Sequence, residues 1–212
     1  EISYMTGDDM LYNHYVACAM FYTDKTADEE TAVYLTNKFI GRLYANGCYA
    51  SAEELLNELG EKLDVTAFDP EARAAYELSL ADVEQMQDKD PRQTLERAQA
   101  AIRRMPEGGA RLLNQAKYDL IAARLAIDEG DFSAAEAILA AYTEEEDFGL
   151  GGDQVYVVCD YRIPYDELAA KLALHRGELD TASDYVDRYI TACDTYSFRA
   201  MKLRLLLYMV KH

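Results

Sequence analysis

One short pattern recurs along this chain: Gly, any residue, a large apolar residue, two further residues and then Ala. Its copies occupy residues 47–52, 130–135 and 177–182. A glycine that ends one helix in a left-handed conformation, followed by a small alanine that allows close packing of the next helix, is typical of a helical hairpin. The recurrence therefore predicts helix-turn-helix units that stack on one another.

The segments between these turns have helical character. Residues 88–91 read Asp-Lys-Asp-Pro and supply a fourth turn that lacks the glycine. Asp69 and Asp90 each stand before a proline, as a capping residue stands before the first helical position, and Ser51 and Ser133 each begin a capping box. We predict helices at 8–22, 27–46, 51–63, 70–87, 91–105, 110–129, 133–142, 165–176, 181–194 and 197–211.

Stacking of these helices follows from their apolar faces. The helix predicted at 110–129 carries apolar residues in one continuous stripe, which a single hairpin cannot bury alone. The sequence therefore predicts an all-α fold, an α-solenoid or superhelix of antiparallel helix-turn-helix repeats. Residues 143–164 form a longer connection than a repeat needs. An extended segment, a short strand or a helix kinked at Pro164 are the alternatives for its last part.

These residues resemble the tetratricopeptide repeats. Ala123, the turn at 130–132 and Ala135 carry the resemblance best, and it extends over residues 31–195. It implies a single repeat domain over 1–212, with degenerate N-terminal helices in 1–30 and a last helix at 197–212. A related superhelix, such as the sensor region of maltose-regulator-type bacterial transcription activators, is the alternative. The chain begins at Glu1 rather than Met, and we expect it to be a fragment of a longer protein or to follow a removed leader.

Composition excludes several classes of partner. The chain has 39 acidic and 21 basic residues and a net charge of -18, which argues against binding of nucleic acid by this domain. It contains no apolar run long enough to span a membrane and no signal peptide at its start. The four cysteines lie far apart and form no zinc or redox pair, so we expect four buried, unpaired thiols in a reducing, cytoplasmic compartment.

No catalytic pattern is present in the sequence. His14, His175 and His212 are too scattered for a metal site, and the glycines at 149–152 lack the features of a phosphate-binding loop. No nucleophile elbow occurs. We therefore expect no enzyme activity, no metal and no cofactor.

The resemblance to tetratricopeptide repeats also implies a ligand groove, because the first helix of each pair lines the concave face in that family. The positions carried over from the family are Tyr34, Asn37, Tyr44, Lys117, Leu120, Ile121, Arg124, Ile127, Lys171, Leu174 and His175. Arg124 and Lys171 occupy the same place in successive copies and could accept an acidic or C-terminal carboxylate. The alternative is that these two side chains are solvated or neutralise neighbouring acids.

The last predicted helix is too apolar to end a solenoid without a cover. It contains four basic and no acidic residues, and we expect an interface there with a further repeat, a second copy or a partner helix through Met201, Leu205, Tyr208 and Met209. The sequence thus predicts a protein- or peptide-binding regulatory or scaffolding module, part of a larger bacterial signalling or transcription-regulating protein. The alternative is a self-assembling structural protein, in which the basic stretch 89–117 and the last helix meet the acidic stretch 128–153 of another copy.

Overall fold

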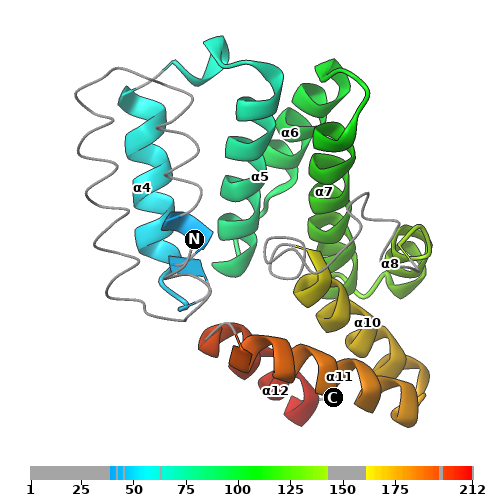
Figure 1. Ribbon diagram of the computed structural model, residues 1–212. Helices are drawn as coiled ribbons and strands as arrows, with labels where there is room; N and C mark the ends of the chain where they lie inside the picture. The colour runs from blue at the N-terminus through cyan, green and yellow to red at the C-terminus, as the bar shows by residue number, and fades with distance from the viewer. Residues whose placement is uncertain are drawn as a thin grey trace. The chain divides into compact units, whose positions relative to one another are not determined.

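The computed structural model describes residues 39–41, 43–44, 46–62, 64–142, 161–195 and 198–211 (Figure 1). All regular elements in these ranges are helical, which confirms the predicted all-α class for this part of the chain. The chain divides into two compact units, residues 1–106 and residues 107–212. Each unit is described by itself below. The single repeat domain and the continuous solenoid stay predictions.

The first unit contains a helical hairpin with a further helix beside it. Helix α5 (Pro70–Met86) packs closely on α6 (Arg92–Arg104), and α4 (Tyr49–Lys62) packs on α5 (Figure 1). A short 3-10 helix (Val65–Ala67) leads from α4 towards α5. The shared core consists of small and branched apolar side chains, among them Ala52, Leu56, Ala74, Leu78, Ala81, Val83, Ala98 and Ile102.

The second unit contains two hairpins and a last helix. The first hairpin pairs α7 (Gly109–Asp128) with α8 (Phe132–Leu139), and the second pairs α10 (Ile163–Arg176) with α11 (Leu179–Thr195). Helix α10 packs on both helices of the first hairpin, and α12 (Arg199–Lys211) packs on α11. The predicted stripe on α7 lies in the core between the hairpins, together with residues of α8 and α10 such as Ala135, Leu139, Leu168 and Leu172.

The turns between paired helices confirm the role of the recurring glycine. Gly47, Gly130 and Gly177 have φ of 77°, 80° and 74°, in the left-handed region that glycine adopts without steric cost. In the degenerate turn Asp88 adopts the same conformation, with φ of 57°. After each of these residues the next N–H donates to the carbonyl five residues earlier, at 2.8–3.0 Å: Cys48 to Leu43, Lys89 to Glu84, Asp131 to Ala126 and Glu178 to Ala173. One hydrogen-bond pattern therefore closes all four turns.

The predicted start at Pro70 with Asp69 as its cap is confirmed, whereas other predicted starts are wrong by one or two residues. Helix α6 begins at Arg92, with Pro91 and not Asp90 in the capping position. The carboxylate of Asp69 accepts from the N–H groups of Glu71 and Ala72, and Asp90 accepts from Arg92 N. Helix α8 begins at Phe132 and is capped by Asp131, because this carboxylate, directly after Gly130, reaches the N–H of Ala134. Helix α4 likewise begins at Tyr49, ahead of Ser51.

The region around Pro164 is also resolved in part. Pro164 lies in the first turn of α10, where its missing N–H removes no hydrogen bond within the helix. The helix predicted at 8–22, most of the one predicted at 27–46 and residues 143–160 of the long connection lie outside the described residues.

Candidate binding surfaces

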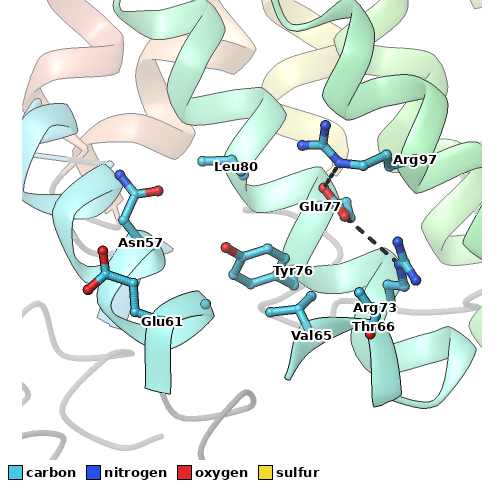
Figure 2. A pocket seen from close by; sticks show the side chains of 10 residues that line it. Asn57, Glu61, Val65, Thr66, Arg73, Tyr76, Glu77, Leu80 and Arg97 are labelled. Carbon is cyan, nitrogen blue, oxygen red and sulfur yellow. Dashed lines mark hydrogen bonds and ion pairs between the residues drawn. The ribbon is translucent and has the colours of Figure 1, made fainter. Parts of the chain in front are cut away.

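The first unit contains a pocket of about 460 Å³ between α4 and α5 (Figure 2). Its wall on α4 includes Asn57 and Glu61, and the opposite side includes Arg73 from α5 and Arg97 from α6. Its other lining residues are Gly60, Val65, Thr66, Tyr76, Glu77 and Leu80. The pocket therefore joins two differently charged walls across an aromatic and aliphatic middle.

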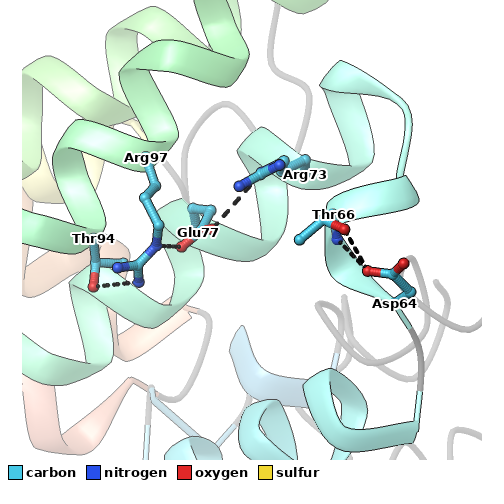
Figure 3. A network of polar contacts seen from close by, with 6 residues as sticks. All are labelled: Asp64, Thr66, Arg73, Glu77, Thr94 and Arg97. Carbon is cyan, nitrogen blue, oxygen red and sulfur yellow. Dashed lines mark hydrogen bonds and ion pairs between the residues drawn. The ribbon is translucent and has the colours of Figure 1, made fainter.

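Two arginines share one buried carboxylate beside this pocket (Figure 3). The side chain of Glu77 is 4% exposed, and its Oε2 accepts from Nε of Arg97 at 2.9 Å. Its Oε1 lies 3.9 Å from Nε of Arg73, one turn earlier on α5. Arg97 also donates through Nη2 to Oγ1 of Thr94 at 3.0 Å. Glu77 thus holds both guanidinium groups at the pocket wall, because a buried carboxylate requires compensation by charge and hydrogen bonds.

The middle of the pocket depends on a close approach between α4 and α5. The ring of Tyr76 is buried, and its hydroxyl donates to the carbonyl of Leu56 at 3.3 Å. A Cβ on Gly60 would lie 2.7 Å from this hydroxyl oxygen, so any larger residue at this position would require the tyrosine or the helix to shift. Burial raises the pKa of Tyr76, with a further contribution from Glu77, and the phenol stays neutral.

The groove positions expected from the first repeat fall only partly on described residues. Tyr34 and Asn37 lie outside them. Tyr44 is buried, its hydroxyl donates to Oδ1 of Asp82 at 3.2 Å, and its ring packs edge-on against Tyr49 with centroids 5.4 Å apart. This tyrosine therefore takes part in packing within the first unit.

In the second unit the two basic residues expected to line a groove are buried. Arg124 on α7 is 1% exposed and Lys171 on α10 is 4% exposed. Nζ of Lys171 lies 2.6 Å from Oε1 of Glu167 and 5.0 Å from the ring centre of Tyr208 on α12. Arg204 of α12 lies 4.0 Å from the same Glu167 carboxylate. The carboxylate that Lys171 contacts is thus internal, and binding of a ligand carboxylate by this residue stays a prediction.

Glu167 is ionised despite its burial. Burial opposes its ionisation, but the charges of Lys171, Arg204 and Arg124 together lower its pKa to about 2. One buried anion therefore holds together basic side chains from three helices.

The remaining expected groove positions are distributed between the core and the surface. Leu120, Ile121 and Ile127 of α7 are buried, whereas Lys117 and Leu174 are half-buried. His175 is exposed and stacks on Phe132 of α8, with ring centroids 3.5 Å apart. The structure does not gather these side chains at one open surface.

Helix α12 carries an exposed apolar stripe that the sequence analysis missed. Met201 and Leu205, expected at an interface, are buried, because they lie on the face of α12 that turns inward. Tyr208 is half-buried and Met209 is exposed. The side chains of the outer face are 59% (Leu203), 60% (Leu207) and 86% (Val210) exposed. Their i, i+4, i+7 spacing was a signal in the sequence, but uniform hydrophobicity around this helix concealed which face was outward.

Further expectations for the described ranges concern metal sites, membrane spans and thiols. They contain no cluster of His, Cys, Asp and Glu that could hold a metal ion, and none of their helices is both long and apolar enough to cross a membrane. Cys48 and Cys193 are free thiols. Cys193 is buried, as expected, and burial raises its pKa to about 12, whereas the expected burial of Cys48 is wrong because this residue lies in the exposed turn before α4. Cys18 and Cys159 lie outside the described residues.

Comparisons with protein-family models, with curated proteins and with solved structures found no match. The resemblance to tetratricopeptide repeats therefore rests on the residues of the hairpins alone and stays a prediction. Function is argued below from the surfaces just described.

Proposed function

We propose that this chain is a protein-binding helical module, in which α12 docks an amphipathic helix whose apolar face is flanked by acidic residues. The observation that carries the proposal is the exposed stripe of Leu203, Leu207 and Val210. At 100° per residue the three side chains fall within an arc of roughly 60°. An exposed apolar stripe of this kind on a packed helix matches the seam of a helix-helix interface.

The basic residues of α12 favour an acidic partner. From Phe198 to Lys211 the helix contains four basic and no acidic residues. Lys202 contacts Asp194 at 2.7 Å and Arg204 lies near Glu167, whereas Arg199 and Lys211 are exposed at the two ends of α12. The chain as a whole carries a net charge of -18, so an acidic partner would be repelled elsewhere and attracted here.

Two other occupants fit α12 less well. A second copy of α12 would bring basic residues against basic residues, which destabilises a symmetric interface. A membrane surface requires a broad apolar face, wider than this arc. The stripe therefore fits a partner helix best, and the expected role in signalling or transcription regulation stays a prediction.

A pair of synthetic peptides tests the proposal. One labelled peptide forms a helix with a leucine face flanked by glutamates, and lysines replace the glutamates in the second. We expect the acidic peptide to bind to the chain, as measured by fluorescence anisotropy, and its affinity to fall as the salt concentration rises. The Leu203→Glu, Leu207→Glu variant should lose about tenfold or more in affinity.

Matched controls come from other helices. Leu112 on α7 and Leu179 on α11 are 59% and 69% exposed, so Leu112→Glu and Leu179→Glu introduce the same change at equally exposed sites. These variants should keep wild-type affinity and helical circular dichroism. Equal binding of both peptides would contradict the proposal. Tighter binding of the chain to anionic vesicles than to the acidic peptide would also contradict it. A salt-sensitive rise in the molar mass of the chain that the Leu203→Glu, Leu207→Glu variant abolishes would contradict it too and would favour self-assembly.

A further inference from the structure

The pocket of the first unit is distinct from α12 and has opposite charges on its two sides. Figure 2 shows Asn57 and Glu61 of α4 on one side of Tyr76, with Arg73 and Arg97 on the other. Its volume of about 460 Å³ lies within the range of roughly 300–1,000 Å³ that is usual for sites of small organic molecules. Both walls consist of side chains that donate or accept charged hydrogen bonds.

The basic wall carries two guanidinium groups, those of Arg73 and Arg97. Two guanidinium groups face the single carboxylate of Glu77, and the contacts to it use Nε of Arg97 and Nε of Arg73. The exposed carboxylate of Asp64, which also feels the charge of Arg73, accepts hydrogen bonds from Thr66. A guanidinium group has five N–H donors, and the contacts to Glu77 and Thr94 use only Nε of each arginine and Nη2 of Arg97, so this wall has further donors for an added carboxylate.

The acidic wall suits a cation of the same ligand. The carboxylate of Glu61 is exposed, and Asn57 lies one helical turn earlier on the same face of α4. An ammonium group donates three hydrogen bonds, which a carboxylate and an amide oxygen can accept. Between the two walls Val65, Tyr76 and Leu80 offer apolar contact.

We propose that this pocket binds a small zwitterion with an apolar middle, of the size of a dipeptide. Its carboxylate binds to Arg73 and Arg97, its ammonium group to Glu61 and Asn57, and its apolar part packs on Tyr76. A simple anion would meet the repulsion of Glu61, and a simple cation would meet that of the two arginines. Only a molecule with both charges complements both walls.

Titration calorimetry of the full chain with the dipeptide Ala-Leu tests this inference. The comparison probes are N-acetyl-Ala-Leu, which lacks the ammonium group, Ala-Leu amide, which lacks the carboxylate, and inorganic phosphate. We expect saturable binding of Ala-Leu and about tenfold weaker binding of each modified peptide. Absence of saturable Ala-Leu binding, or equal binding of Ala-Leu and N-acetyl-Ala-Leu, would overturn the proposal.

Variants at each wall connect the binding to these residues. Glu61→Gln should lower the affinity for Ala-Leu by about tenfold, and the affinity for N-acetyl-Ala-Leu should stay unchanged or rise. Arg73→Gln should lower the affinity for Ala-Leu by a similar factor but leave the affinity for Ala-Leu amide unchanged. This variant keeps Glu77 paired with Arg97. Glu54→Gln, an exposed residue of α4 outside the pocket, is the control and should bind as wild type. If phosphate binds as tightly as Ala-Leu, the pocket is a simple anion site and the proposal of a zwitterionic ligand is overturned.

Discussion

Nζ of Lys171 lies 2.6 Å from Oε1 of Glu167, one turn away on α10, and both side chains are buried. Arg204 lies 4.0 Å from the same carboxylate. A buried ion pair of this kind is costly to break, because removal of Lys171 takes away the nearest of the three basic groups that balance the buried Glu167 carboxylate.

Lys171→Met should therefore destabilise the folded chain strongly. We expect the free energy of unfolding in urea to fall by about 3 kcal/mol. Addition of Glu167→Leu to Lys171→Met should not recover this loss, because Glu167 also balances the charge of the buried Arg124. The control is Lys202→Met, which removes an exposed pair with Asp194 and should cost under about 1 kcal/mol. Equal losses for the two single variants would contradict this account.

Asp166 makes stability depend on pH. Burial raises its pKa to about 6, although Arg188, whose Nη2 lies 2.6 Å from Oδ1, acts in the opposite direction. The unfolded carboxyl titrates near 3.8, so between these values the folded chain binds the proton more tightly. This group therefore lowers the free energy of unfolding as pH rises from about 4 to about 6, by on the order of 2–3 kcal/mol.

Urea unfolding at several pH values checks this dependence. Asp166→Asn should remove the fall in the free energy of unfolding between about pH 4 and pH 6. On acidification the wild type should therefore gain stability relative to this variant. Asp194→Asn, which changes an exposed carboxylate that also bonds to a basic side chain, is the control and should keep the fall that Asp166 causes. A parallel pH profile for wild type and Asp166→Asn would refute the assignment.

Gly60 and Tyr76 should be energetically coupled. Gly60→Ala alone should destabilise the first unit, because the new Cβ would lie 2.7 Å from the phenol oxygen. In a Tyr76→Phe background the nearest ring carbon is 3.5 Å away, an ordinary contact, and the helix preference of alanine should then dominate. A double-mutant cycle by thermal unfolding should give a coupling of about 1 kcal/mol, and additive effects would contradict the close approach.

Asp88 is a site where glycine should stabilise the fold. It adopts φ of 57° at an exposed turn, a conformation that is unfavourable for residues with a Cβ. We expect Asp88→Gly to raise the free energy of unfolding by about 0.5–1 kcal/mol. Asp90→Gly, two residues later, should have the opposite effect because Asp90 accepts from Arg92 N. If both variants shift stability in the same direction, the conformational argument fails.

Much of the local structure could be predicted from the sequence. The left-handed glycines at 47, 130 and 177, the cap at Asp69 and the position of each described helix follow from short-range rules. Hydrogen bonds in helices and their turns join residues at most five apart, so a local pattern carries this information. The N-cap of α8 was misplaced because Asp131 and Ser133 are both suitable capping residues within the same turn.

The candidate surfaces depended on contacts between residues far apart in the chain. The residue types at Arg124 and Lys171 allowed either a groove or internal neutralisation, and the packing of α7, α10 and α12 gave Lys171 an internal carboxylate. Arg73 and Arg97 belong to different helices, and only the fold brings both to Glu77.

Local sequence patterns predict that this chain forms helices and where they turn, because backbone hydrogen bonding and the steric freedom of glycine act over a few residues. Which side chains are covered depends instead on the packing of the helices against one another. On α12 this packing turned Met201 and Leu205 inward and left Leu203 and Leu207 outward, although all four are equally apolar by type. The reason is physical: burial is a property of the neighbours that pack against a helix, and those neighbours are remote in the chain.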